Sequence, residues 1–187
     1  MAIRADLVRR AQAGDREAFG ALVHAVIARL FATARLILRD PDLAQDVVQD
    51  ALVDAWRDLR GLRDPDRLDA WLHRILVRSC YRTARRIRGR TIAEIPLLDD
   101  HDRPVADGLE RIGLRDEIER ALDHLQTDHR AALVLVYFAD LSIADAAIAL
   151  GIPIGTMKSR LNRALDALRA TLAADARLEL ATKERTA

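Results

Sequence analysis

The sequence contains a single cysteine among 187 residues, and only 4% of its residues are aromatic. One cysteine, Cys80, excludes a disulfide framework and a thiolate zinc site, and it favours a reducing, cytoplasmic compartment. The amino-terminal stretch MAIRADLVRR lacks the apolar core of a signal peptide. The longest apolar run, AALVLVYFA at 131–139, is shorter than a bilayer-spanning helix requires, so we expect no membrane insertion.

The residues that are plentiful favour helices. Half of the chain is hydrophobic, alanine, leucine, arginine and aspartate dominate, and runs of β-branched residues are few. Apolar side chains recur at helical spacing from residue 3 to 38, with a break at Gly14-Asp15, where Asp15 is a candidate N-cap. We therefore expect an all-α protein, with further helices over 42–60, 67–88, 114–125, 128–139, 143–150 and 154–174.

Proline and glycine divide the chain into two parts. Asp66 is the expected N-cap of the helix that starts at residue 67, and Gly89 is its expected end. Helical periodicity then fails while prolines and glycines recur, which predicts a linker. We expect two small helical domains over 1–90 and 114–175, joined by a flexible linker at 91–113 and followed by a frayed tail at 176–187.

The helix expected over 42–60 carries an acidic face. Aspartates recur every four residues, and at about 100° per residue they form one slowly drifting stripe. Like charges at this spacing repel, and a basic partner would relieve the repulsion. A solvated face on an amphipathic helix accounts for the same pattern. The acidic face consists of Asp42, Asp46, Asp50, Asp54 and Asp58, with Gln45 and Gln49 beside it.

The following helix has the opposite charge. Residues 70–93 hold seven arginines and no aspartate or glutamate. Unopposed guanidinium groups along one helix indicate a surface for phosphate, and arginine suits bidentate contacts. A solvated or acid-paired face is the alternative. The arginine face consists of Arg74, Arg78, Arg82 and Arg85, continued by Arg86. The linker reverses the sign again, with Glu94, Asp99, Asp100, Asp102, Asp107 and Glu110.

Residues 142–163, SIADAAIALGIPIGTMKSRLNR, predict two helices joined by a tight turn. Ser142 is a candidate N-cap, Gly151 suits a left-handed turn residue, and Pro153 is acceptable in the first turn of the second helix. In helix-turn-helix proteins the second helix enters the DNA major groove, where Arg and Asn read bases. A merely structural helical hairpin is the alternative. The expected exposed residues are Thr156, Lys158, Ser159, Arg160, Asn162 and Arg163.

At this point the sequence resembles a known family. LGIPIGTMKSRLNRALDALR is similar to the DNA-reading end of bacterial extracytoplasmic-function (ECF) sigma factors, within the sigma-70 family. DLAQDVVQDALVDAW (42–56) resembles the family's polymerase-binding helix, and LDAWLHRILVRSCYRTARR (68–86) resembles its promoter-melting helix. The order and spacing of the three blocks also fit. The resemblance covers roughly residues 10–90 and 114–174.

The resemblance implies a sigma factor of two domains, sigma-2-like and sigma-4-like, without a cofactor. It implies docking on the clamp helices of core RNA polymerase through Asp46, Gln49, Asp50 and Asp54. Recognition of the −10 promoter element, with a flipped base held by the loop 62–69, would fall to Arg63, Asp64, Asp66, Arg74, Arg78, Arg82, Arg85 and Arg86. The −35 element would be read by Thr156, Lys158, Ser159, Arg160, Asn162 and Arg163.

The same resemblance gives further expectations. The polymerase flap is a second contact, the acidic linker passes through the RNA channel, and an anti-sigma factor is a candidate partner. The chain departs from the family at Ser79, where asparagine is frequent, and at Arg82, where an acid is frequent. Ala146 replaces a frequent isoleucine, while Ile148 and Ile154 replace polar residues. We expect these three to loosen the helix-turn-helix core or to form an extra protein contact.

Rival functions explain less of the sequence. A stand-alone helix-turn-helix regulator needs only the second domain and gives no reason for the acidic face. A helical interaction protein without DNA binding leaves the arginine face unexplained. The five histidines have no metal-ligand spacing and no catalytic constellation recurs, so we expect no enzyme activity of its own. Trp56 is expected in the core, whereas Trp71 is either a core residue or a wedge that melts DNA.

Overall fold

The computed structural model describes residues 2–94 and 112–186, and every regular element in those ranges is helical, which confirms the all-α prediction. The expected acidic linker lies mostly at 95–111, outside the described residues. The helices are α1 (Ala2–Gln12), α2 (Arg16–Leu38), α3 (Pro41–Asp58), α4 (Leu68–Glu94), α5 (Ile112–Asp123), α6 (Thr127–Leu133), α7 (Ile143–Leu150) and α8 (Ile154–Thr186). Short helical turns are η1 (Leu59–Gly61), η2 (Pro65–Arg67) and the π-helical η3 (Val134–Phe138).

The first domain packs α2, α3 and α4 against one another, with α1 across α2. Large apolar residues such as Leu30 and Ile37 are fully buried at its centre. α2 and α3 pack against each other, and several of their buried residues are alanines, whose methyl side chains let neighbouring helices approach closely. We call this set the alanine seam, and it consists of Ala34, Ala44, Ala51 and Ala55.

Side-chain caps set the starts of these helices. Asp15 caps α2 as predicted, since its Oδ1 accepts hydrogen bonds from the backbone N–H groups of Glu17 and Ala18, both at 3.0 Å. Asp40 caps α3 in the same way, and Pro41 occupies the first helical position. The predicted cap at Asp66 is wrong: Asp64 is the capping residue, and its Oδ1 accepts from the N–H of Asp66 at 3.0 Å.

Two helix ends differ from prediction. The helix expected to stop at Gly89 continues as α4 to Glu94, because one glycine costs a long helix only about 1 kcal/mol. The tail expected to fray after residue 175 continues as α8 to Thr186. Alanine, leucine, lysine, arginine and glutamate dominate that segment, and all five favour helices.

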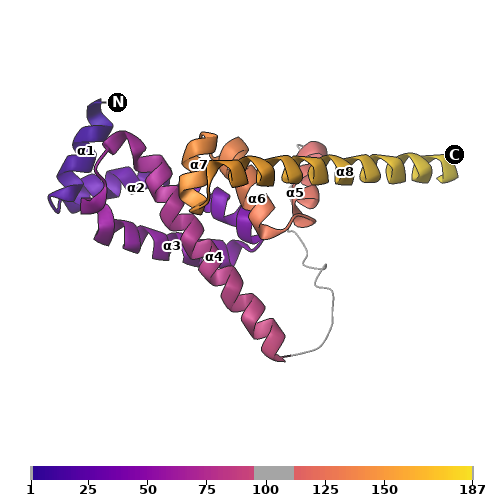
Figure 1. Ribbon diagram of the computed structural model, residues 1–187, viewed down its shortest axis with the longest axis horizontal. Coiled ribbons are helices and arrows are strands. Elements are labelled where there is room, and N and C mark those ends of the chain that lie inside the picture. Colours follow the sequence, from indigo (N-terminus) through magenta and orange to yellow (C-terminus); the bar gives the residue numbers. More distant parts are fainter. Residues whose placement is uncertain (1, 95–111, 187) are drawn as a thin grey trace.

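The second domain consists of α5 to α8, with α6 and α7 packed on the first half of α8 (Figure 1). Met157 and Ala146 are fully buried between α7 and α8. Alanine at position 146, where the family often has isoleucine, therefore leaves the core packed. Ile148 and Ile154 are each about half exposed, at 50% and 51%, so they add apolar surface without disturbing that core.

The two domains are in contact. Figure 1 shows α4 crossing alongside α7, and the last turns of α2 lie against α6 and η3. The buried apolar residues of both domains form one continuous cluster. By length and composition alone, α2 is apolar enough to span a membrane. The core helices of soluble proteins meet the same criterion, and the buried face of α2 packs in the core.

Candidate nucleic-acid interface

The acidic face lies on the outer side of α3. Asp42, Asp46, Asp50 and Asp58 are exposed, as are Gln45 and Gln49. The opposite side of the helix is buried through Val47, Val48 and the three alanines of the seam that lie on α3. Capping by Asp40 orients α3 from its first turn, so the core packing and the cap together turn the carboxylates outward.

Asp54 is the exception on this face. Its Oδ2 lies 3.8 Å from Nη2 of Arg82 on α4, and its Oδ1 lies 4.0 Å from Nη1 of Arg57. The arginine helix has no acidic residue of its own over 70–93, and at Arg82 the acid-paired alternative left open by the sequence is what the structure shows. The reason is tertiary, because α3 and α4 pack side by side and bring the two charged faces into contact.

The arginine face is otherwise directed into solvent. Arg74, Arg78, Arg82, Arg85 and Arg86 are all exposed, while Ser79 and Cys80 on the same helix are buried. The alternation follows from α4 packing one side onto α2 and α3. Nη2 of Arg82 also donates to Oγ of Ser79 at 3.0 Å, which holds this guanidinium near the helix.

The loop before α4 carries three of the predicted −10 residues. Arg63 and Asp66 are exposed, whereas Asp64 is committed to capping the turn η2. Next to this loop lies an ion pair that the sequence analysis missed. Both carboxylate oxygens of Asp69 accept from Arg4, at 2.7 and 2.5 Å, and Arg29 contributes a third bond at 3.1 Å. The hydrogen bonds from Arg4 hold the pKa of the Asp69 carboxyl below its usual range.

A buried histidine stands behind the arginine face. His73 is 1% exposed, and its Nδ1 lies 2.7 Å from the backbone oxygen of Asp69, one turn earlier. Burial disfavours the charged ring and lowers the pKa of His73. The neutral ring therefore donates its Nδ1–H to that carbonyl. A lone histidine with this geometry is a core residue rather than a metal ligand.

The helix-turn-helix forms as predicted. Oγ of Ser142 accepts from the N–H of Asp145 at 3.1 Å and caps α7. Gly151 ends the helix in the left-handed conformation at φ 66°, and its N–H bonds to the carbonyls of Ala147 and Ile148. Pro153 lies just before α8 rather than within it, and its carbonyl accepts from the N–H of Met157 at 3.0 Å.

Most of the predicted DNA-reading residues are exposed on the first turns of α8. This is so for Thr156, Lys158, Ser159, Asn162 and Arg163. Arg160 is different, because its side chain is 24% exposed and its Nη2 lies 3.0 Å from Oδ2 of Asp128. The expectation of an exposed Arg160 is therefore wrong. The cause is the start of α6, which packs against α8 and places Asp128 within reach.

Arg160 faces a cavity between the domains. The cavity has a volume of about 400 Å³ and is lined by Tyr81, Ala84 and Arg85 from α4 and by Asp128, Ile152 and Arg160 from the second domain, among others. Residues predicted to contact the −10 and the −35 elements, Arg85 and Arg160, thus line one space. Spacing along the chain alone does not reveal this juxtaposition.

The two tryptophans and the cysteine are surrounded by other side chains of the fold. Trp56 packs against Phe19 in a tilted arrangement with ring centroids 4.9 Å apart, and Trp71 packs partly buried against the core. Burial raises the pKa of the Cys80 thiol to about 12. Within residues 2–94 and 112–186, no group of three or more histidine, cysteine, aspartate or glutamate side chains is placed to hold a metal ion.

Comparison with known proteins identifies the family. Residues 22–91 match the family described as Sigma-70 region 2, and residues 115–168 match Sigma-70, region 4. The ECF RNA polymerase sigma factor SigM of Mycobacterium tuberculosis is 39% identical over 160 residues, which cover 86% of this chain and 80% of that protein. RNA polymerase sigma-H factor of Pseudomonas aeruginosa is 33% identical over 174 residues, covering 87% and 90% respectively. The chain belongs to the sigma-70 family of transcription initiation factors and, within it, to the ECF type.

Solved structures agree with this assignment. The sigma factor RpoE of Bartonella quintana, in complex with the anti-sigma factor NepR, superposes with a TM-score of 0.67 at 32% identity, covering 84% of this chain and 98% of that one. CnrH, in complex with the cytosolic domain of CnrY, gives a TM-score of 0.65 at 28% identity, covering 92% and 99%. Two sigma domains in an all-α fold are therefore shared with these proteins.

Proposed function

We propose that this protein binds core RNA polymerase and directs it to promoters that carry a particular pair of −35 and −10 elements. The observation that supports the proposal best is the order of three surfaces along one chain. An acidic helix, an arginine-rich helix and a helix-turn-helix follow one another, and each surface has the charge that its partner requires.

Core polymerase is the partner proposed for α3. The carboxylates of Asp46 and Asp50 are exposed, and Gln49 lies between them in the sequence as an exposed donor and acceptor. A basic surface on the clamp helices would relieve the repulsion along this face. Asp54 belongs to the proposed surface as well, with Arg82 as a competing partner at its edge.

The −10 element is the partner proposed for α4 and the preceding loop. Exposed guanidinium groups from Arg74 to Arg86 would bind the phosphate backbone, and the neighbouring loop would hold a base flipped from the duplex. Arg63 and Asp66 are accessible for that contact, whereas Asp64 would act indirectly, by capping and stabilising the turn η2.

The −35 element is the partner proposed for the start of α8. Arg160 and Asn162 are the side chains suited to bases, and Thr156, Lys158, Ser159 and Arg163 are suited to phosphates and flanking contacts. The proposed domains are 1–90 for polymerase and the −10 element, and 114–175 for the −35 element. The polymerase flap would be a second docking point for the latter.

Further features follow from the same proposal. The protein would act in the cytoplasm, where polymerase is found, and would perform no chemistry of its own. An anti-sigma factor is a proposed regulator, because the similar sigma factor RpoE of Bartonella quintana is described in complex with the anti-sigma factor NepR. A stand-alone transcription regulator and a helical interaction protein are disfavoured by the family assignment.

Run-off transcription tests the proposal. Bacterial core polymerase is given a pool of genomic fragments with and without the protein, and discrete new start sites are expected only with it. Replacing Asp46 and Asp50 by arginine should abolish these starts and polymerase binding, while circular dichroism and unfolding curves stay unchanged because both side chains are exposed. Asp166→Arg is the matched control, since Asp166 is an exposed aspartate on the far domain. Normal polymerase binding by the Asp46/Asp50 variant would refute α3 as the docking surface.

A further inference from the structure

Helix α1 contacts both ends of the loop that precedes α4. The loop follows η1 and passes through η2, and both of these turns pack against α1. Gln12 is the last residue of α1, and its Nε2 donates hydrogen bonds to the backbone carbonyls of Leu59 and Leu62, at 3.0 and 2.7 Å. The first end of the loop is therefore held by its backbone, through one side chain that lies far away in the sequence.

Arg4, near the start of α1, holds the other end of the loop. Its guanidinium group donates to both carboxylate oxygens of Asp69, which lies in the first turn of α4. Arg29 of α2 donates to the same carboxylate and supports it from a second helix. At about 1.5 Å per residue, Arg4 and Gln12 are roughly 12 Å apart along α1. One helix thus fixes the two ends of the loop relative to each other.

Between these ends, the loop has a charged tip at residues 63–67. Leu62 and Leu68, on either side of the tip, are buried at 6% and 2% exposure and anchor it to the core. The charged residues of the tip are all exposed: Arg63, Asp64, Asp66 and Arg67. Because so much of the tip is exposed, its shape depends on where its two ends are held.

We propose that α1 is a positioning helix for this tip. Gln12 and Arg4 hold the ends of the loop so that the tip keeps one shape and discriminates strictly between bases at the −10 position that it captures. A site that cannot rearrange around a different base rejects that base, whereas a loose loop adapts to several. The selection of a base rests on the proposed function, but the bracing of the loop by α1 does not.

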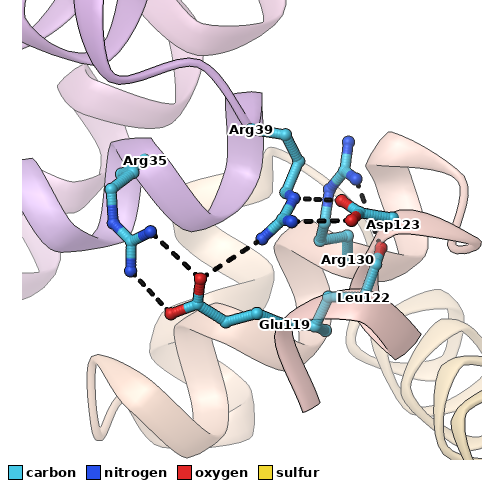
Figure 2. Close-up of polar contacts among 6 residues, drawn as sticks. All are labelled: Arg35, Arg39, Glu119, Leu122, Asp123 and Arg130. Carbon is cyan, nitrogen blue, oxygen red and sulfur yellow. Dashed lines mark hydrogen bonds and ion pairs between the residues drawn. The ribbon is translucent and has the colours of Figure 1, made fainter. Parts of the chain in front are cut away.

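A second ion pair of the same kind provides a matched control. Arg35, in the last turn of α2, donates to both carboxylate oxygens of Glu119, at 2.8 and 3.1 Å (Figure 2). Glu119 lies on α5, and Figure 2 shows it between the guanidinium groups of Arg35 and Arg39. Arg35→Met therefore removes the same charge and the same bidentate geometry as Arg4→Met, at a pair that holds neither end of the loop.

Backbone hydrogen exchange in the free full-length protein tests the bracing directly. The N–H groups of Leu62 and Arg67 close η1 and η2, through backbone hydrogen bonds of 3.0 and 3.1 Å. Arg4→Met and Gln12→Met should each raise the exchange rates of these two N–H groups at least about threefold, because a turn opens more often once one end of the loop is released. Residue-resolved NMR measures both rates.

Two controls and one conservative variant make this result specific. Arg35→Met should leave both rates unchanged, and so should Arg10→Met, since Arg10 is on α1 but pairs with Asp15 at the start of α2. Arg4→Lys keeps the charge without the bidentate fork, so its rates should fall between those of the parent and Arg4→Met. Urea unfolding confirms that each variant is folded. Unchanged rates in both brace variants, or equal increases in the controls, would overturn the bracing.

Base preference in the polymerase complex is the second readout. Run-off transcription from promoters that differ at single positions gives the preference at each one. Arg4→Met and Gln12→Met should lower the preference at the same −10 position at least about threefold and leave the −35 preference unchanged, because both act through one loop. Gln12 is uncharged, so its effect cannot come from lost attraction to phosphate.

The possible outcomes separate the proposed role from its alternatives. Reduced activity with unaltered preference at every position would overturn the positioning role. A lower salt dependence of promoter binding by Arg4→Met, with unaltered preference, would show instead that Arg4 contacts a phosphate. If the exchange rates rise as expected but the parent chain starts no transcripts, the bracing stands, and the proposed promoter function falls together with the base selection that rests on it.

Discussion

Arg160, near the start of α8, lies 3.0 Å from Asp128 in the first turn of a different helix, α6. The pair keeps the arginine half-buried in the free protein, although a base-reading arginine must reach into the major groove. Asp128 thus holds the side chain in a defined place, and the proposed contact with a base requires that this pair be released or reoriented. The neighbouring Asn162 and Arg163 are exposed and need no such release.

Arg160→Ala should weaken −35 discrimination, by about 1–3 kcal/mol if one bidentate base contact is lost. Competition between promoter duplexes that differ at single −35 positions, with the polymerase complex, measures the effect. Arg169→Ala is the control, because Arg169 is an exposed arginine on the same helix and forms a local ion pair with Asp166. An Arg160 variant with unaltered preference at every position would show that the side chain reads no base.

Gly151→Ala should destabilise the second domain by about 1–2 kcal/mol, because alanine is strained at φ 66°. Nothing lies within 4 Å of an added Cβ, so the cost would be backbone strain alone. Gly20→Ala is the matched substitution within α2, where the space is equally open and φ is not positive, and it should stabilise slightly. Urea unfolding of both variants measures the difference. Equal effects of the two substitutions would contradict this explanation.

Cys80 should resist alkylation in the folded protein. The thiol is 0% exposed and burial raises its pKa to about 12, so the reactive thiolate is scarce at pH 8. We expect no reaction with iodoacetamide over the time in which free cysteine reacts fully, and complete reaction in urea. Mass spectrometry measures the extent of labelling. Rapid modification under native conditions would show that α4 separates readily from α2 and α3.

His73 should make the first domain less stable as the pH falls below about 6.5. Its pKa is lowered in the folded state, so between the folded value and the ordinary value the unfolded chain binds more protons. Stability is therefore fully present above the ordinary pKa and declines as the pH falls toward the folded one. Urea unfolding from pH 7.5 to 5 should show a shallower decline for His73→Leu than for the parent chain. Parallel curves would mean that His73 does not titrate in this window.

Hydrophobic periodicity and turn chemistry were sufficient to predict the helices and several of their caps. Asp15 and Ser142 cap helices, and Gly151 is left-handed, because each of these features depends on residues within one turn. The cap at Asp64 rather than Asp66 was missed since Pro65 starts a separate short turn before α4. Gly89 does not end its helix, because α4 continues through it to Glu94.

The candidate surfaces were predictable as faces but not as contacts. That α3 is acidic and α4 basic follows from local spacing, whereas the approach of Arg82 to Asp54 depends on how the two helices pack. The same limit applies to Arg35 and Glu119, which are 84 residues apart along the chain. Many surface charges compete for such partners, and no local pattern selects among them. Whether the predicted residues bind polymerase or DNA stays a prediction.

The alanine seam has a consequence for how this protein can diversify. The four methyl groups of the seam lie in the packed core, and a bulkier residue at Ala44 or Ala55, both fully buried, would have to displace the side chains around it. Outward-facing residues on the same helices carry no such constraint. Promoter and partner preference can therefore drift through exposed side chains over many generations, while the seam preserves the frame on which each new preference is displayed.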